Sequence, residues 1–445
     1  MYPNPITVMK TMPRLFPDSD LRIFPGRLEN SQMDMKTDCE FIVHNALRAV
    51  YPEEAVSRAL QRKSYDCGKL ILVSVGKAAW SMANAAWNTL TRLPDTGIII
   101  TKYGHGKGEI GHLEIWEAGH PLPDHNTYSA TQRALEMTEG LTDQDHVLFL
   151  LSGGGSALFE KPLISEADMI SITEQLLGCG AEISEINVVR KRLSAVKGGR
   201  FAEHCAPAKI FSIVLSDVIG NRLENIASGP ACDDPTTSEQ ALEIVHKYGL
   251  QLSKEAYDSL RHETPKHIAN VETVITGSVT ELCNAAASAC ESLGYHAVVL
   301  TDSLTCQARE AGAFLAAIAR YYQKTDRSLA FLAGGETVVK LTGSGKGGRN
   351  QEIVLSAAEG ISGLRNTAVF SLGSDGTDGP TDAAGGFVTG ETANKLSECG
   401  ISIYDTLQNN DAYHALAQCN GLLITGATGT NVNDVSVILI RRPDN

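Results

Sequence analysis

The chain has 445 residues, of which 43% are hydrophobic and 20% are charged, and its formal net charge at neutral pH is −14. This length predicts two or three domains, and the composition excludes a globally disordered protein. The acidic balance argues against general nucleic-acid binding, which needs a basic surface, and no apolar run approaches the length of a membrane span.

Cysteine usage points to a reducing compartment. Ten cysteines are scattered along the chain and none forms a CxxC pair, so a zinc site is poorly supported. Thiols of this number and spacing in a long chain are typical of reduced, intracellular proteins, and we expect a cytoplasmic location. Residues 1–35 contain five prolines and no continuous apolar core of a signal peptide, which predicts an irregular extension.

Strands and helices alternate through the first half of the chain. Helices are predicted at 37–50, 56–62, 77–90, 128–138, 165–177 and 184–196, and strands at 69–75, 96–101, 113–118, 147–151 and 209–216. Such alternation predicts a doubly wound parallel sheet of the Rossmann-like kind, covered on both faces, in an amino-terminal α/β domain over residues 36–235. Ligands of these sheets lie beyond the carboxyl ends of the strands.

A second α/β domain is expected over residues 236–445, beginning somewhere between 236 and 275. Its predicted helices are 236–248, 254–261, 280–293, 307–322, 351–359, 391–399 and 413–417. Its predicted strands are 269–275, 296–300, 329–333, 337–341, 367–372, 422–425 and 435–439, with 383–387 preceding a helix. We find no internal repeat and no low-complexity segment.

The loop Ser152-Gly153-Gly154-Gly155-Ser156 follows a buried strand and precedes a predicted helix. Three adjacent glycines lack Cβ atoms, so this backbone can approach a ligand closely and adopt positive φ. Several N–H groups would then point toward one place, which favours an anion. A tight turn without a ligand is the alternative interpretation, and the strand–loop–helix context favours the anion site.

Cations stand at other strand ends. Lys77 follows the strand at 69–75 and opens a helix, where the helix dipole disfavours a positive charge, so a role in meeting an anionic substrate is favoured over a solvated surface lysine. The segment 342–352, TGSGKGGRNQE, nearly matches a nucleotide P-loop, with Gly343 and Gly348 correctly spaced. Arg349 and Asn350 replace the required Lys and Ser or Thr, so it is not a Walker loop. A polyphosphate site and a mobile surface loop both remain open for it.

Carboxylates complete the candidate set. Asp375 and Asp378 lie in the turn-rich segment 373–382, and Asp217 follows the strand at 209–216. Oxygen ligands suit Mg²⁺, although Asp-Gly and Gly-Pro are also ordinary turn sequences. His120, between Gly119 and Pro121, could act as a base, although a lone histidine is more often structural.

Two glycine-rich loops, strand-end cations and candidate metal carboxylates form the inventory that phosphoryl transfer needs, because that chemistry depends on positioning and charge neutralisation. Hydride transfer needs a dinucleotide fingerprint, and the first strand is followed by Val75-Gly76-Lys77-Ala78, which lacks the second glycine.

On these residues the sequence resembles the glycerate 2-kinases of the two-domain class whose carboxyl-terminal domain is called MOFRL. The matching stretches are VGKA (75–78), GHPLPD (119–124), LSGGGSAL (151–158), NVVRKRLSAVKGG (187–199), LSDV (215–218), ASGP (227–230), GGET (334–337), GGRNQE (347–352) and DGTDGPT (375–381). The resemblance implies a MOFRL-type second domain with its core near residues 329–440. It also implies ATP- and Mg²⁺-dependent phosphorylation of D-glycerate at O2, with the active site in the interdomain cleft, and it leaves a homodimer open.

The resemblance also implies roles for individual residues. Lys77 and Arg349 correspond to the family's catalytic cations. The residues implied in substrate and phosphate binding are Ser152, Gly153, Gly154, Gly155, Ser156, Lys191, Gly347 and Gly348, and the metal carboxylates would be Asp217, Asp375 and Asp378. Some members carry the name hydroxypyruvate reductase, so an NAD(P)H-dependent reductase is one alternative function, and a nucleotide-binding regulator without turnover is another.

Overall fold

The computed structural model describes residues 35–61 and 63–442, which fold into two compact units, each built on a six-stranded sheet. The first unit comprises Ala46–Ala285 and Gly429–Asn433. The second comprises Ala286–Thr428 and the described parts of Met1–Asn45 and Asp434–Asn445. The predicted irregular extension falls outside the described residues except for Met35, which begins helix α1 (Met35–Ala49).

The sheet of the first unit is entirely parallel, with the strand order β3-β2-β1-β4-β5-β6. Its strands are β1 (Leu70–Val75), β2 (Thr96–Lys102), β3 (Glu114–Ala118), β4 (His146–Leu151), β5 (Lys209–Leu215) and β6 (Val271–Gly277). This is the order of doubly wound sheets, in which ligands bind where the strand order reverses, here between β1 and β4. The predicted α/β class with a Rossmann-like first sheet is confirmed.

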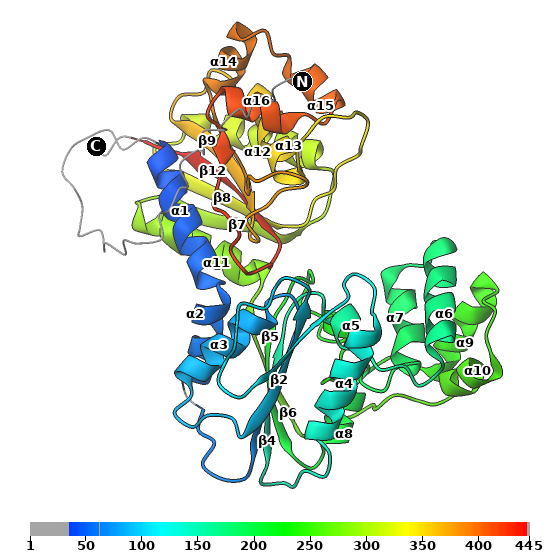
Figure 1. Cartoon of the computed structure of the whole chain (residues 1–445). Coiled ribbons are helices and arrows are strands. Elements are labelled where there is room, and N and C mark those ends of the chain that lie inside the picture. The colour runs from blue at the N-terminus through cyan, green and yellow to red at the C-terminus, as the bar shows by residue number, and fades with distance from the viewer. Residues whose placement is uncertain (1–34, 62, 443–445) are drawn as a thin grey trace, which may run out of the picture. The chain divides into compact units, whose positions relative to one another are not determined.

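Helices cover both faces of this sheet (Figure 1). They are α2 (Pro52–Leu60) and α3 (Ala79–Thr89) on one face, and α4 (His125–Met137) and α8 (Arg200–Cys205) on the other. Alternation along β1 feeds both cores: Ile71 and Val73 pack in the core with α4 and α8, while Leu70 and Leu72 pack in the core with α2 and α3.

Four further helices of the first unit form a layer with an apolar core of their own (Figure 1). They are α6 (Glu166–Gly178), α7 (Ile183–Arg192), α9 (Ser238–Tyr248) and α10 (Lys254–Leu260). Together with β6, which pairs with β5, they place the stretch up to residue 285 in the first unit. The units therefore divide later along the chain than the predicted boundary at 235/236, because the strand pattern near residue 270 completes the first sheet instead of starting the second.

The sheet of the second unit is mixed, with the order β11-β10-β9-β12-β8-β7. Its strands are β7 (His296–Leu304), β8 (Leu329–Gly335), β9 (Thr367–Gly373), β10 (Gly385–Thr389), β11 (Leu422–Leu423) and β12 (Asp434–Ile440). Since β12 runs antiparallel to both neighbours, its first residue, Asp434, lies opposite Gly335 and Gly373, at the carboxyl ends of β8 and β9. The strand predicted at 337–341 is not formed, and Val338 makes only an isolated bridge with Gln307.

The remaining helices complete the second unit and its links. They are α11 (Val279–Ser292), α12 (Ala308–Tyr321), α13 (Arg349–Gly360), α14 (Thr392–Glu398), α15 (Ile403–Gln408) and α16 (Ala412–Gln418). The first unit also contains the short helix α5 (Gly155–Leu158), which begins within the loop after β4, and the 3₁₀ turn η1 (Ile226–Ser228). The second unit contains the 3₁₀ turn η2 (Tyr322–Lys324). Helices α12 and α13 pack closely, because a Cβ on Gly312 would lie only 2.1 Å from the carbonyl oxygen of Ile353. They share one apolar core with β8, β9 and β12.

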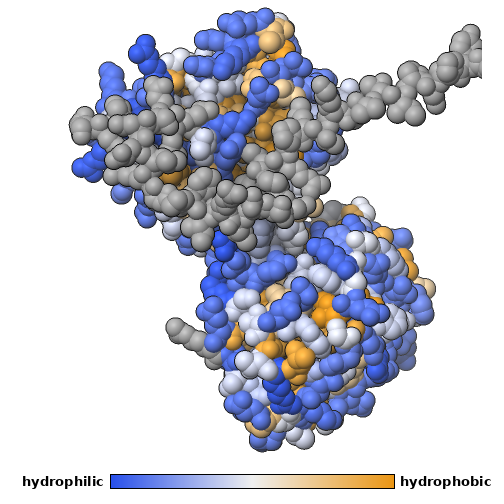
Figure 2. All heavy atoms as spheres, turned by 60° about the vertical axis from the view of Figure 1, so that its left-hand side comes forward, coloured by the Kyte–Doolittle hydropathy of each residue, from blue (hydrophilic) through white to orange (hydrophobic). Residues whose placement is uncertain are grey.

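Among the described residues, no helix combines the length and apolar character needed to cross a bilayer. On the face of the first unit seen in Figure 2, hydrophilic side chains predominate and apolar ones form small separate groups. The apolar residues of this unit are mainly inside, in the two cores that cover the sheet.

Candidate active site

The ends of β1 and β4 bring Lys77 and the first glycine loop side by side. Val75 pairs with Leu151 in the sheet, so the segments that follow these residues leave it at the same edge. The N–H of Lys77 donates to the carbonyl of Gly153 at 2.9 Å, and the Ser152 hydroxyl accepts the N–H of Ala78 at 3.1 Å. These two predicted site elements therefore form one hydrogen-bonded structure.

Glycine is required where these segments meet. Gly76 has φ +119°, and a Cβ there would lie 2.2 Å from the Ser152 hydroxyl oxygen. Gly154 has φ +87°. Within the described chain, we find no acceptor for the N–H groups of Gly153 and Gly154. Two adjacent unpaired donors beside a lysine can accept a phosphate or carboxylate oxygen.

Three side chains border this loop. A Cβ built on Gly154 would lie 3.1 Å from the His120 ring and 3.3 Å from Cγ of Lys77, and one built on Gly153 would lie 2.2 Å from a carboxylate oxygen of Asp217. Among the described residues, the Lys77 ammonium has no carboxylate within ion-pair distance. Burial, followed by the charge of Lys77, lowers the pKa of His120, so its imidazole is neutral at pH 7.

Lys191 does not join this group. Its side chain is buried and its ammonium lies 3.1 Å from Asp234, which also faces Arg192 at 3.9 Å. Because this ion pair already satisfies the ammonium inside the protein, Lys191 anchors α7 to the segment around Asp234. The neighbouring Arg190 instead reaches the glycine loop and donates from Nη2 to the carbonyl of Ser156 at 3.2 Å.

Arg349 begins α13 and is held by carboxylates. Its Nε donates to Asp434 at 2.5 Å, one Nη donates to the same carboxylate at 3.0 Å, and the other donates to Glu336 at 2.8 Å. Burial opposes the charge, but the hydrogen bonds and charge of Asp434 outweigh it and raise the pKa of the guanidinium. Three of the five N–H donors are used, which leaves two for a ligand.

Most of the second glycine loop is tied to the segment before α16. The N–H groups of Thr342 and Gly343 donate to the Asn410 side chain at 2.7 and 2.9 Å, and that of Gly345 donates to the Asn409 carbonyl at 2.8 Å. The N–H of Lys346 donates to Asp411 at 2.9 Å, and its ammonium lies over the Tyr413 ring. These groups are therefore not free to bind a polyphosphate.

The end of that loop is different. In the described part of the chain, the N–H groups of Gly347 and Gly348 have no hydrogen-bond acceptor, and they directly precede Arg349. A Cβ on Gly348 would lie 2.2 Å from the Asp378 carboxylate, so only glycine fits there. The candidate anion site of the second unit therefore consists of these two N–H groups and the unused donors of Arg349.

Asp378 serves as the cap of α13. Its carboxylate accepts the N–H of Asn350 at 3.2 Å and that of Gln351 at 2.9 Å, and it is 2% exposed. Burial raises the pKa of Asp378 to about 7. Asp375 accepts the N–H and hydroxyl of Thr377 within its own turn.

These features do not form a metal site. No group of three His, Cys, Asp or Glu side chains in the described residues is arranged to hold a metal ion. Asp378, with both oxygens engaged and a raised pKa, is poorly suited to Mg²⁺, and Asp217 belongs to the other unit. The predicted trio is therefore not assembled within either unit.

Sequence reasoning missed Asp434, Glu336, Arg190 and Ser228 as partners of the site residues. Asp434 was not predictable because it lies 85 residues after Arg349 in the sequence. It is the first residue of β12, and because β12 runs antiparallel to β8 and β9, this first residue lies beside the last residues of those two strands. Glu336 after Gly334-Gly335 was visible in the sequence, although its pairing with Arg349 was not. Arg190 and Ser228 lie within stretches that the resemblance quoted without a role.

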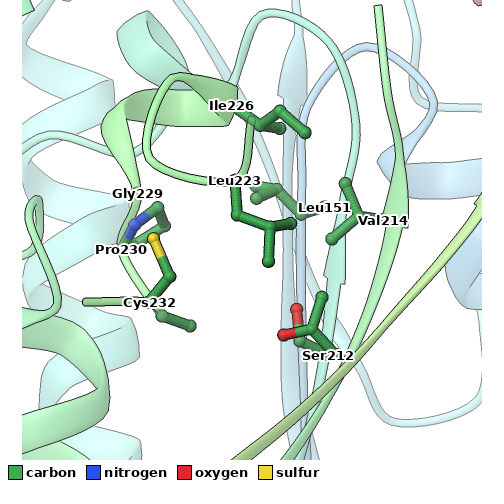
Figure 3. Close-up of a pocket in the computed structure, with 10 residues that line it drawn as sticks. Leu151, Ser212, Val214, Leu223, Ile226, Gly229, Pro230 and Cys232 are labelled. Atoms are coloured by element: carbon green, nitrogen blue, oxygen red, sulfur yellow. The ribbon is translucent and has the colours of Figure 1, made fainter. Parts of the chain in front are cut away.

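A small cavity lies between the ends of β4 and β5 and the segment 223–232 (Figure 3). Its volume is about 10 Å³, and Leu151, Val214, Leu223 and Ile226 point into it opposite Gly229 and Cys232. This space holds at most one water molecule and is mostly apolar.

Comparison with known proteins identifies both parts of the chain. Residues 38–261 match the model described as a domain of unknown function, DUF4147, and residues 329–434 match the MOFRL family. A protein of Thermotoga maritima named D-glycerate 2-kinase is 51% identical over 405 residues, covering 90% of this chain and 97% of its own. A protein of Pyrococcus horikoshii named glycerate 2-kinase is 38% identical over 439 residues, covering 92% of this chain and 98% of its own. The crystal structure of a glycerate kinase from Thermotoga maritima matches with a TM-score of 0.89 at 50% identity, covering 92% of this chain and 99% of that one.

Proposed function

This chain belongs to the glycerate kinase family that combines a DUF4147 domain with a MOFRL domain, and we propose that it uses ATP to phosphorylate D-glycerate at O2, giving 2-phospho-D-glycerate. The observation that carries the proposal is the 51% identity, over nearly the whole of both chains, to a protein named D-glycerate 2-kinase. The unpaired donors beside Lys77 support it, because phosphoryl transfer depends on positioning and charge neutralisation.

Lys77 and the N–H groups of Gly153 and Gly154 would hold oxygens of the transferred phosphoryl group or of the acceptor. In the second unit, Gly347, Gly348 and the two unused donors of Arg349 would bind a phosphate in the same manner. Asp434 and Glu336 hold the guanidinium, so its remaining donors keep a fixed direction. Planar, fixed donors suit phosphate better than a mobile ammonium does.

Magnesium is expected to accompany ATP, since this ion is usually held by substrate phosphates and waters with one or two carboxylates. Asp375 and Asp378 are committed to local hydrogen bonds, so we assign no step to a metal held by them. The neutral imidazole of His120, beside Lys77, could accept the proton of the acceptor hydroxyl.

The test is turnover. The protein is incubated with ATP, MgCl₂ and D-glycerate, and ADP release is followed by a coupled assay, while phosphorus NMR identifies the product. We expect ADP and 2-phosphoglycerate. A product phosphorylated at O3 would exclude the O2 assignment. Oxidation of NADH with hydroxypyruvate, in place of ADP release, would favour a reductase, and ATP binding without turnover would favour a regulator.

A further inference from the structure

An excess of positive charge lies at the far end of the first glycine loop. Glu160 is fully buried, and its carboxylate faces two cations: the ammonium of Lys197 at 3.0 Å and the guanidinium of Arg190 at 3.6 Å. Burial lowers the pKa of Lys197 to about 8, so this side chain remains mostly protonated at pH 7. One carboxylate against two cations leaves a net positive charge, which favours binding of an anion.

Arg190 has donors to spare. A guanidinium carries five N–H groups, and among the described residues the Arg190 side chain makes one hydrogen bond, from Nη2 to the carbonyl of Ser156 at 3.2 Å. Its Nε is buried and donates no hydrogen bond in the described chain. Asn187 lies one turn earlier on the same face of α7, so both side chains leave the helix toward the same side.

A strained backbone turn lies beside the Ser156 end of the loop. Ala227 and Ser228 have φ +50° and +62°, a left-handed conformation that is unfavourable for a residue other than glycine. The N–H of Gly198 donates to the Ser228 carbonyl at 3.0 Å and holds this geometry. Strain that the surrounding structure maintains is common at functional sites.

The strained turn places the Ser228 hydroxyl between two side chains. It donates to Oδ1 of Asn187 at 3.0 Å and lies 3.2 Å from the Ser156 hydroxyl. Since its single hydrogen goes to Asn187, the Ser156 hydroxyl must be the donor in the second bond. This chain of hydrogen bonds fixes Asn187 and the loop residue to which Arg190 is attached.

We propose that Arg190 binds the carboxylate of the acceptor substrate, with Asn187 beside it and Ser228 as a positioning residue. The assignment rests on the proposed glycerate kinase function. A planar guanidinium with free donors matches a carboxylate. Lys77 and the unpaired N–H groups of Gly153 and Gly154 lie at the other end of the same short loop, so a small hydroxy acid can present its carboxylate to one end and its reacting hydroxyl to the other.

The test compares Arg190→Ala, Arg190→Lys and Ser228→Ala with the parent protein, using D-glycerate and its uncharged analogue glycerol as acceptors. We expect Arg190→Ala to lower kcat/KM for glycerate about 10- to 100-fold, the range for a lost charge-assisted hydrogen bond, mainly through KM. The KM for ATP should stay near the parent value, and any turnover of glycerol, which has no carboxylate, should not fall as that of glycerate does. Arg190→Lys keeps the charge opposite Glu160 and should recover only part of the loss, and Ser228→Ala should raise KM for glycerate with little change in kcat.

Arg133→Ala is the matched control, because Arg133 is an arginine of the same unit in an exposed ion pair with Glu114. Circular dichroism and thermal midpoints establish whether each variant is folded. If Arg190→Ala is not folded, the kinetics of Arg190→Lys provide the test instead. A raised KM for ATP would assign Arg190 to a nucleotide phosphate and overturn the inference. Unchanged glycerate kinetics in an active enzyme would overturn the inference alone, whereas a parent protein inert toward glycerate would overturn the proposed function with it.

Discussion

Replacing Asp378 with Asn should change how the stability of the second unit depends on pH. Burial raises the pKa of this carboxyl from 3.8 to about 7 in the folded protein, although the N–H groups of Gln351 and Asn350 oppose the rise. Between these values the carboxyl is protonated when folded and ionised when unfolded. Unfolding then releases a proton, so rising pH favours the unfolded state.

The magnitude follows from the difference between the two pKa values. About 3 units at about 1.4 kcal/mol each give roughly 4 kcal/mol of stability lost between pH 4 and pH 7, with no further loss above pH 7. Asn cannot ionise, so Asp378→Asn lacks this loss. Its amide still accepts one of the two N–H groups, at a cost of about 1 kcal/mol for the other. The variant should therefore be about as stable as the parent at pH 5 and roughly 3 kcal/mol more stable at pH 7 and pH 8.

Urea unfolding at pH 5, 6, 7 and 8 measures this difference. The chain has three tryptophans, Trp80, Trp87 and Trp116, all in the first unit, so fluorescence follows that unit and circular dichroism also reports the second. Asp124→Asn is a control of opposite sign: burial raises the pKa of this cap of α4, but hydrogen bonds from Tyr103 and Thr127 outweigh it and lower the pKa. Equal pH slopes for Asp378→Asn and the parent would refute the reasoning.

Three further predictions concern the strand-end loops. Lys77→Ala should lower kcat about 10²- to 10³-fold with little change in the KM for ATP. Lys209→Ala, at the opposite edge of the same sheet, is the control and should keep the parent kinetics. Equal kcat values for the two variants would remove Lys77 from the mechanism. Arg349→Lys should lower kcat and thermal stability together, because an ammonium cannot replace three directed hydrogen bonds to Asp434 and Glu336; parent-like turnover would mean that charge alone suffices. Gly76→Ala should destabilise the first unit by several kcal/mol, since its Cβ would overlap Ser152 at positive φ, and an unchanged fluorescence midpoint in urea would contradict this.

The close approach of Lys77 and the loop at 152–156 was predictable because its signals are local. A buried apolar strand, a glycine and a lysine identify the end of β1, and the alternation of strands and helices predicts a parallel sheet whose carboxyl ends share an edge. The second sheet was less predictable, because β12 enters antiparallel between β8 and β9 after a long separation in sequence. The division between the two units was also hard to predict. It depends on the pairing of β6 with β5 across a long intervening segment, and no change in composition marks it.

The two glycine loops illustrate why residue type alone could not decide which of them has N–H groups free to bind an anion. Both contain the sequence signal, but most N–H groups of the second are taken by Asn409, Asn410 and Asp411, which the sequence places more than sixty residues away. A loop that already has acceptors cannot bind phosphate without losing them. In the described chain, the N–H groups of Gly347 and Gly348 have no acceptor, and Arg349 beside them keeps two unused side-chain donors.

The same argument separates the cations. Arg349 faces two carboxylates, so its immediate surroundings are negative and its contribution is the direction of its two remaining donors. Arg190 shares one carboxylate with Lys197, so its surroundings are positive and it can attract an anion by charge. Arg349→Lys should consequently lose most of the activity, because the directed hydrogen bonds of the guanidinium are lost. Arg190→Lys should keep part of the activity, because the positive charge that attracts the anion remains although the planar pair of donors is lost. Similar losses of kcat/KM in Arg349→Lys and Arg190→Lys would mean that the charges around each arginine do not determine how it acts.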